Sequence, residues 1–186
     1  MRKVTAGLFL SLDGVVESPE KWQLPYFNDE MGEAIGAAMA ATDTMLLGRV
    51  TYQEFASYWP GVSAKDQPFA NHMNNTPKFI VSTTLAEPLE WQNSTLIKEN
   101  VAEEISTLKQ PGKDISILGS ATLVRSLLRD DLLDELRLMI HPIVLGTGKR
   151  LFEDGGNQKA LNLVGSKTFS TGVLYLIYQP DRNEPK

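Results

Sequence analysis

The feature that most constrains the fold of this sequence is a unit that occurs twice: a short apolar strand that runs through a glycine directly into a helix. In "ISILGSATLVRSLL" (residues 115–128) the strand ends before Gly119, and the following helix has an apolar face made of Leu123, Val124, Leu127 and Leu128. "MLLGRVTYQEF" repeats this pattern around Gly48. Strands that alternate with helices predict a mostly parallel sheet with helices on both faces.

The remaining apolar segments complete this alternation. Strands are expected at residues 4–10, 44–47, 79–82, 95–98, 135–144, 161–168 and 173–178, besides the one before Gly119. Helices are expected after Asn28 or Asp29, over 49–58, as one turn near 69–73, after a capping box of Asn100 and Glu103, and after Gly119. The end without helices predicts an antiparallel C-terminal hairpin. We therefore expect one α/β domain at 1–180 and a polar, frayed tail at 181–186.

Composition excludes several classes of function. The 186 residues carry a net charge of −5, which argues against a nucleic-acid partner. The absence of cysteine removes disulfides, thiol nucleophiles and cysteine-based zinc sites. No apolar stretch has the length of a membrane span, and the short N-terminal apolar run does not fit a signal peptide. The sequence predicts a cytoplasmic protein without membrane partners.

Three strand ends carry residues that suit an anionic ligand. Glycine allows close approach to the backbone, helix starts offer free N–H groups, and Arg49 adds a cation. The three segments are Gly48, Arg49, Val50 and Thr51; Ser82, Thr83 and Thr84; and Gly119, Ser120, Ala121 and Thr122. Each alone is ordinary turn or strand-end chemistry. Together they predict one edge that holds an extended ligand with several phosphates.

Several motifs in this order resemble the dihydrofolate reductase fold and, within it, the family that includes the reductase domain of bifunctional riboflavin-biosynthesis proteins. The motifs are "GLFLSLDGVVE", "LLGRVTYQEF", "FIVSTT", "ILGSATL" and "HPIVLGTGKRLF", and the resemblance covers nearly the whole chain. It implies an NADPH-dependent reductase and a homodimer. It also implies that the Gly-Arg-x-Thr helix start and the turn at Gly119 bind cofactor phosphates, and that the hydroxyls after Val81 bind the adenosine 2′-phosphate.

Two departures from the resembled families concern the substrate. Leu118 stands where riboflavin reductases tend to carry glutamate, which argues against that exact substrate. "WQLP" (residues 22–25) resembles the Trp-x-Leu-Pro of dihydrofolate reductases, but Phe27 occupies the position of their acid. In a third departure, Ser120 stands in place of the second glycine of the usual pair. Serine can still cap the helix that follows Gly119, so we expect phosphate binding to be kept.

The substrate side has fewer distinctive residues. Asp13 and Asp29 are candidate proton donors, with Glu30 beside them, although Asp13 also fits a turn residue and Asp29 a helix N-cap. Water is a third source of the proton. Aromatic residues could line a flat pocket or simply pack. The predicted substrate contacts are Ser11, Trp22, Phe27 and Tyr52, with Tyr26 nearby.

Two further motifs have less specific interpretations. "VLGTGKRLF" (residues 144–152) fails as a P-loop and fits an exposed basic turn, with an anion site, pocket closure or dimer contact as alternatives. His72 and His141 lie far apart and form no metal motif, so no metal is predicted. We interpret His141 as a packed edge residue rather than a base.

Two functions fit the sequence. The first is an NADPH-dependent reductase of a small heterocyclic or carbonyl-like substrate, in which the cofactor supplies the chemistry. The second is an NADPH-binding module without turnover. A hydrolase is not supported, because Ser82 and Ser120 lie outside a G-x-S-x-G motif.

Overall fold

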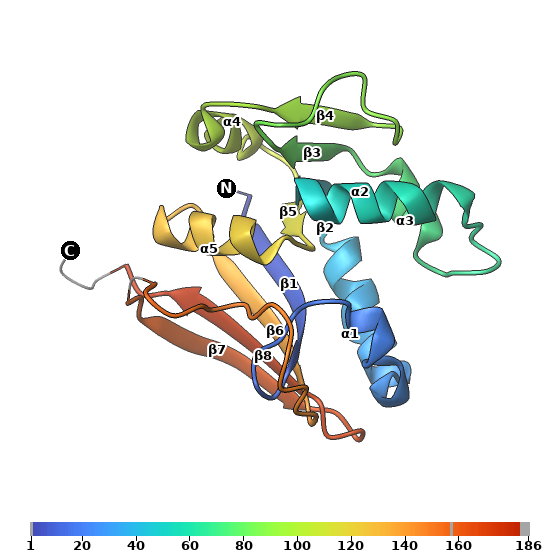
Figure 1. Cartoon of the computed structure of the whole chain (residues 1–186), viewed down its shortest axis with the longest axis vertical. Helices are drawn as coiled ribbons and strands as arrows, with labels where there is room; N and C mark the ends of the chain where they lie inside the picture. The colour runs from blue at the N-terminus through green and yellow to red at the C-terminus, as the bar shows by residue number, and fades with distance from the viewer. Residues whose placement is uncertain (1, 157, 183–186) are drawn as a thin grey trace.

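The computed structural model describes residues 2–156 and 158–182, and within them one eight-stranded sheet forms the centre of the molecule (Figure 1). Its strands lie in the order β4-β3-β2-β5-β1-β6-β8-β7. Their bounds are β1 (Val4–Ser11), β2 (Thr42–Gly48), β3 (Lys78–Val81), β4 (Ser94–Ile97), β5 (Asp114–Ile117), β6 (Glu135–His141), β7 (Leu161–Thr168) and β8 (Leu174–Pro180).

The pairing of the strands confirms the predicted mostly parallel sheet. β4, β3, β2, β5, β1 and β6 pair in parallel, whereas β8 pairs antiparallel with both β6 and β7. β7 and β8 form the predicted C-terminal hairpin. Because the parallel strands all end at the same edge, the loops that follow them meet there.

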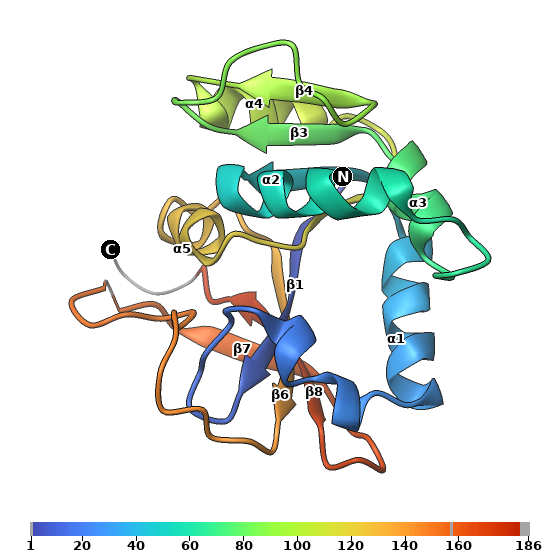
Figure 2. The same ribbon diagram turned by 45° about the vertical axis from the view of Figure 1, so that its right-hand side comes forward.

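Helices cover both faces of the sheet, as predicted. They are α1 (Asp29–Ala40), α2 (Arg49–Tyr58), α3 (Ala70–Asn75), α4 (Val101–Leu108) and α5 (Ala121–Arg129). Side chains alternate between the faces: Leu46 of β2 belongs to the core cluster with α4 and α5, whereas Met45 and Leu47 pack with α2 and α3. Figures 1 and 2 show α5 and α1 on opposite sides of β1.

The helix starts test the predicted caps. Asn28 caps α1 by accepting a hydrogen bond from the Met31 N–H (3.0 Å), and Ser120 caps α5. The predicted capping box at Asn100 is wrong. Asn100 has a left-handed backbone (φ 54°) and makes no side-chain cap bond, whereas a capping side chain needs an extended backbone to reach back to the first turn.

Two boundaries differ from the prediction for physical reasons. β6 ends at His141 instead of residue 144, because Pro142 follows and has no N–H group with which to continue the pairing. β6 also lies between β1 and β8, so His141 is on an interior strand and the expected edge position is wrong. The long loop after β1 contains two 3₁₀ turns, Pro19–Lys21 and Leu24–Tyr26.

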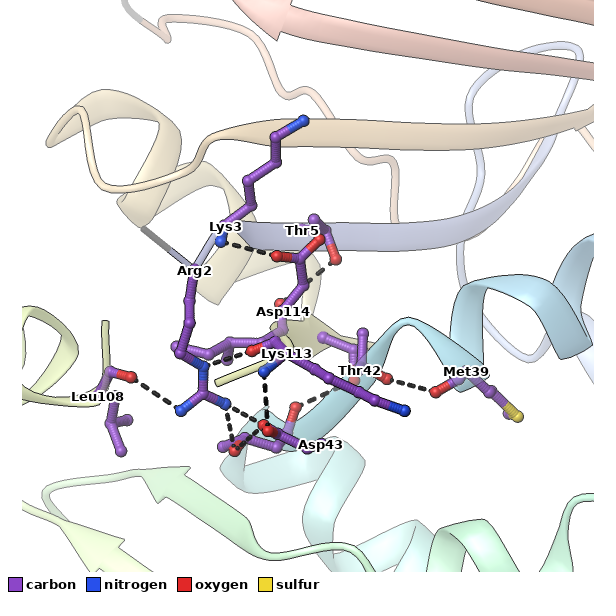
Figure 3. Close-up of polar contacts among 12 residues, drawn as sticks. Arg2, Lys3, Thr5, Met39, Thr42, Asp43, Leu108, Lys113 and Asp114 are labelled. Atoms are coloured by element: carbon purple, nitrogen blue, oxygen red, sulfur yellow. Dashed lines mark hydrogen bonds and ion pairs between the residues drawn. The ribbon is translucent and has the colours of Figure 1, made fainter. Parts of the chain in front are cut away.

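The edge at which the parallel strands begin is held together by Arg2 (Figure 3). Its guanidinium donates to the carbonyl oxygens of Lys113 and Leu108, to Asp43 and, at 2.7 Å, to the Thr44 hydroxyl. This arrangement ties the start of β1 to β2 and to the loop between α4 and β5. These bonds stabilise the edge where the parallel strands begin, whereas the three predicted phosphate-binding segments follow the opposite ends of the strands.

Of the predicted polar tail, residues 183–186 lie outside the described residues. Arg182 forms an ion pair with Asp134, just before β6, with 2.6 Å between the nitrogen and oxygen atoms. Among the described residues, no helix combines the length and the apolar character needed to cross a membrane.

Candidate functional site

The structure brings the three predicted phosphate-binding segments together at one edge of the sheet. β3, β2 and β5 are consecutive strands, and the register pairs Gly48 with Val81 and Leu46 with Ile117. The segments that begin at Ser82, Gly48 and Gly119 therefore lie next to one another. None of their predicted ligand residues carries a carboxylate, so the segments offer an anion only donors, hydroxyls and one cation.

Gly48 and Gly119 form the closest contact between two of these segments. The Gly48 N–H donates to the Gly119 carbonyl (3.1 Å). A Cβ atom on Gly48 would lie 2.4 Å from the Ser120 Oγ, and one on Gly119 would lie 2.6 Å from the Thr51 Oγ1. Gly119 also has a φ of +142°, which side chains rarely adopt. Both positions thus require glycine, and the starts of α2 and α5 meet there.

The two helix starts differ in how their N–H groups are satisfied. At α5, the Ser120 Oγ accepts from the Leu123 N–H (3.3 Å). At α2, the N-cap is Gly48, and no side chain caps the helix. Arg49 and Val50 are exposed, and the Arg49 guanidinium contacts only the side chain of Gln53 among the described side-chain bonds (3.2 Å). The α2 start therefore presents N–H groups and a cation to an anion.

The hydroxyl segment after β3 divides into two parts. Ser82 is buried, and its Oγ accepts from the N–H groups of Thr84 (3.2 Å) and Leu85 (3.1 Å). It therefore shapes the turn. Thr83 and Thr84 are exposed and available to a ligand. At the third segment, Thr122 is exposed and its hydroxyl accepts from Arg125 (3.4 Å), whereas Ala121 is half-buried.

On the substrate side, Asp13 holds two loops together. Its carboxylate accepts hydrogen bonds from the Ser11 hydroxyl (2.7 Å) and from the N–H groups of Leu145 (3.1 Å) and Gly146 (2.9 Å). These bonds, that from Ser11 foremost, hold the pKa of Asp13 well below its usual range. Asp13 is therefore an ionised anchor between the loop after β1 and the loop after β6.

The predicted basic turn is part of the same contact between loops. Val15 pairs with Arg150 in an antiparallel bridge, and the Arg150 side chain donates to the Asp13 carbonyl (2.9 Å). A Cβ atom on Gly148 would lie 2.7 Å from the Val15 Cγ1. Two N–H groups of this segment donate to the chain's own Asp13 carboxylate, so they hold the two loops together.

The other predicted substrate-side residues differ in their exposure to solvent. Ser11 is buried at the end of β1, and Trp22 is buried with its indole N–H donating to the Glu17 carbonyl (3.0 Å). Phe27 and Asp29 are exposed, at and just after the end of the loop.

Tyr52 does not join these substrate-side residues. It is buried in the core with Met45 and Trp91, and its hydroxyl accepts from the Trp91 N–H (3.1 Å). Because α2 turns this side chain inward against β2 and β3, its position fits packing and is unsuited to the predicted substrate contact.

Sequence reasoning missed the setting of His141. This residue is fully buried at the end of β6, directly opposite Ser11 of β1. The alternation of β6 was a usable signal, because it places His141 on the same face as Met139, toward α1. The position beside β1 was not readable from the sequence, because strand order is a tertiary property.

The fold is that of an α/β domain whose mostly parallel sheet ends in an antiparallel hairpin. The sequence matches the family model of the RibD C-terminal domain over residues 2–175, and the chain belongs to that family. It is 33% identical to the Bacillus subtilis (strain 168) protein YyaP over 183 residues, which cover 95% of this chain and 94% of YyaP.

Solved structures share the fold. A Shewanella sp. PV-4 protein whose name connects it with riboflavin biosynthesis superposes with a TM-score of 0.78 at 23% identity, covering 98% of this chain and 100% of that one. The dihydrofolate reductase of Enterococcus faecalis, in a complex with NADP(H), superposes with a TM-score of 0.63 at 12% identity, covering 96% of each chain. These similarities confirm the dihydrofolate-reductase-like fold that the sequence motifs predicted.

Proposed function

We propose that this protein is an NADPH-dependent reductase that transfers hydride to a small heterocyclic or carbonyl substrate. One observation carries the proposal: three donor-rich segments free of carboxylates meet at the ends of β3, β2 and β5, beside the uncapped start of α2. Such an edge fits a ligand with several phosphates. Membership of the RibD C-terminal domain family supports the reductase assignment.

Each segment has a proposed role toward the cofactor. Arg49, the free N–H groups of the first turn of α2 and the Thr51 hydroxyl bind phosphate. Thr83 and Thr84, on the turn shaped by Ser82, bind the 2′-phosphate that distinguishes NADPH from NADH. Gly119, Ser120, Ala121 and Thr122 bind the pyrophosphate. When bound, NADPH supplies the hydride, and the chain supplies binding and orientation.

The substrate is proposed to bind where β1 and β6 end, near Ser11, Trp22 and Phe27. An ionised Asp13 has no proton to donate, so the arrangement favours Asp29 or water as the proton source. Asp13 then has the role of holding the substrate-side loops. The same arrangement is compatible with the second function, an NADPH-binding module without turnover, because a domain without a positioned acid can bind NADPH and leave a substrate unreduced.

A thermal shift experiment with NADPH, NADP⁺ and NADH tests the cofactor. At a ligand concentration 100 times the Kd, binding stabilises by about 2.7 kcal/mol, which raises Tm by roughly 5–10 °C for a domain of this size. We expect such a rise with NADPH and NADP⁺ and a smaller one with NADH. Equal shifts with all three nucleotides would contradict the assignment of Thr83 and Thr84 to the 2′-phosphate. No shift with any of them would contradict the assignment of NADPH as the cofactor.

The Asp29→Asn variant tests Asp29 as the proton source, and turnover by the unmodified protein separates the reductase from the module. If Asp29 supplies the proton, NADPH oxidation with a pteridine or pyrimidine substrate falls while the thermal shift with NADPH is unchanged. Glu33→Gln, an exposed carboxylate on the same helix, is the matched control. Absence of turnover in the unmodified protein with all substrates tested, together with intact NADPH binding, would favour the module.

We also propose a homodimer. β7 is an edge strand, and the hairpin exposes Leu163 (54%), Val164 (52%) and Leu174 (38%). Leu163 and Val164 are neighbours on this edge strand, and exposed apolar side chains that lie together are typical of an interface. Light scattering coupled to size-exclusion chromatography should report twice the chain mass, and Leu163→Glu should shift it to the monomer. A monomer in the unmodified protein would contradict the proposal.

A further inference from the structure

His141 lies at the centre of an aromatic cluster on the face of the sheet that carries α1. Its ring centroid is 5.1 Å from that of Trp22, 5.7 Å from that of Tyr26 and 5.8 Å from that of Phe9. All three rings stand nearly perpendicular to the imidazole, at 75–88°. The imidazole is fully buried. A polar ring enclosed in this way needs its hydrogen bonds accounted for.

The contacts of Nδ1 determine where the proton of His141 lies. Nδ1 is 2.9 Å from the carbonyl oxygen of Met139 and 3.1 Å from that of Leu10. Carbonyl oxygens only accept, so Nδ1 carries the hydrogen. Burial lowers the pKa of His141 and keeps the ring neutral. In that form Nε2 is an acceptor.

Nε2 is the unpaired end of this ring. It is buried and has no hydrogen-bond partner among the described residues. The bonds of Nδ1 to the two carbonyl oxygens account for one nitrogen of the ring, whereas Nε2 is left among the aromatic rings without a donor. A buried acceptor without a donor lowers stability, so Nε2 is suited to a donor that is supplied from outside the chain.

The position of His141 is suited to meeting a ligand. It pairs with Ser11 at the end of β1, and β1 lies directly between β6 and β5, whose end carries Gly119. Its cover comes from the loop after β1, where Trp22 and Tyr26 belong to a 3₁₀-rich segment with exposed Leu24 (64%) and Phe27 (43%). Asp13 and Glu17, earlier in the same loop, bond to the loop after β6, and in the segment that covers the imidazole the Tyr26 hydroxyl donates to the Pro142 carbonyl at 3.5 Å.

We propose that Nε2 of His141 accepts a hydrogen bond from a ring N–H of the substrate, after the segment with Trp22 and Tyr26 moves aside. This inference rests on the proposed reductase function and narrows its substrate. A flat heterocycle with an N–H donor satisfies Nε2, whereas a simple ketone or aldehyde has no donor and leaves it unpaired. The site should discriminate strongly between these substrates, because a substrate without a donor leaves the buried Nε2 without a hydrogen bond. His141 is therefore a specificity-determining residue.

The chain is well suited to a direct test, because it contains two histidines, His72 and His141. In protein labelled with ¹⁵N-histidine, the variant His72→Gln leaves one imidazole to observe by NMR. Without ligand, the spectrum should show a neutral ring with the hydrogen on Nδ1. A hydrogen on Nε2 would overturn the proposal. If His72→Gln does not fold, the unmodified protein gives the same information from two signals, assigned by comparison with His141→Phe.

The ligand test uses two probes in the presence of NADP⁺: lumazine, a pteridinedione with ring N–H groups, and 1,3-dimethyllumazine, in which methyl groups replace those hydrogens. Lumazine should shift the Nε2 resonance and bind at least tenfold more tightly than the dimethyl compound. In His141→Phe, which keeps an aromatic ring and removes the acceptor, the difference in affinity should disappear. A difference that persists in His141→Phe is steric and overturns the proposal.

The remaining outcomes separate this inference from the cofactor assignment. Binding of lumazine without a change at Nε2, or failure of both probes to bind up to their solubility limits, overturns the role of His141 even when the NADPH thermal shift is intact. Conversely, a lumazine-dependent change at Nε2 in a protein whose Tm does not rise with NADPH supports the acceptor role of His141 and contradicts the assignment of NADPH as the cofactor. Thermal shifts with NADPH should be equal in His141→Phe and the unmodified protein.

Discussion

At the scale of single residues, the proposed phosphate-binding edge contains positions at which one added carbon atom changes the geometry. Gly119 is the sharpest case, because its φ of +142° and its contact with Thr51 both exclude a side chain. Arg49 is the opposite case: it is exposed and makes few contacts, so its value lies in what it offers to a ligand. The two residues therefore predict different effects on stability and on binding.

The variant Gly119→Ala should reduce both stability and NADPH binding. Its Cβ would lie 2.6 Å from the Thr51 Oγ1 and would force α2 and α5 apart. We expect a loss of about 1–3 kcal/mol in the free energy of unfolding, from strain and displaced backbone. Urea denaturation measures it. Gly7→Ala is the matched control, because nothing lies within 4 Å of a Cβ atom there. Equal losses in both variants would contradict the close contact.

The variant Arg49→Ala should weaken NADPH binding by about 1–3 kcal/mol and leave stability nearly unchanged, because an exposed cation that pairs with phosphate contributes mainly to the complex. Isothermal titration calorimetry measures the affinity. Lys65→Ala removes the same charge from an exposed loop beyond the C-terminal end of α2 and serves as the control. If both variants bind NADPH equally well, Arg49 is not a phosphate ligand.

At the scale of elements, one carboxylate ties α1 to the C-terminal hairpin. Glu30 accepts from the Ser170 hydroxyl (2.6 Å), the Ser170 N–H (2.8 Å) and the Asn28 side chain (3.1 Å). These bonds, the one from the Ser170 hydroxyl foremost, lower the pKa of Glu30 to about 2. α1 begins at Asp29, so this tie fixes the end of the helix nearest the proposed substrate site.

The Glu30 tie predicts a specific dependence of stability on pH. Because the pKa is lower in the folded state than the ordinary value of 4.5, the stabilisation is complete above that value and is lost as the pH falls toward about 2. Glu30→Gln should therefore lower stability at pH 7 and flatten part of the decline between these pH values, as measured by urea unfolding. Glu33→Gln, on the exposed side of α1, should leave the decline unchanged. Identical profiles for both variants would show that Glu30 does not contribute.

Most elements were predictable because their signals are local. The apolar periodicity and Gly48 place α2 at residues 49–58, as the structure has it, and a serine after Gly119 is enough to predict the cap of α5. The capping box at Asn100 failed because the pattern of residue types does not specify the backbone angle that a cap needs. The predicted end of β6 was also wrong for a local reason. The apolar run continues past His141, but Pro142 stops the pairing.

At the scale of the whole molecule, the edge where the parallel strands begin and the edge where they end carry different kinds of residues. Arg2 fastens the edge where the parallel strands begin, through bonds to β2 and to the loop before β5. The three predicted phosphate-binding segments lie at the opposite edge. Substitutions at the edge where the strands begin should therefore lower stability without changing ligand binding.

The variant Arg2→Ala tests this separation. Loss of charged hydrogen bonds that are largely shielded from water should cost about 1.5–3 kcal/mol in the free energy of unfolding. NADPH affinity should be unchanged, because the strands between the two edges keep their register. Urea denaturation and calorimetry measure the two quantities, with Lys65→Ala again as the control. A large loss of NADPH affinity in the folded Arg2→Ala protein would show that the edges are coupled.

The sequence by itself determined the alternating elements, the parallel sheet with its final hairpin, and the residue types at three strand ends, because periodicity, glycine and capping chemistry act over a few residues. Only the tertiary structure decided which distant segments meet. In the folded protein the Tyr52 side chain packs in the core, where its hydroxyl accepts from the Trp91 N–H. The Asp13 carboxylate accepts a hydrogen bond from the backbone of a loop 132 residues away. The His141 ring is buried against Trp22. These outcomes depend on strand order and on the packing of loops, and a side chain's role follows from the neighbours that such long-range contacts bring to it.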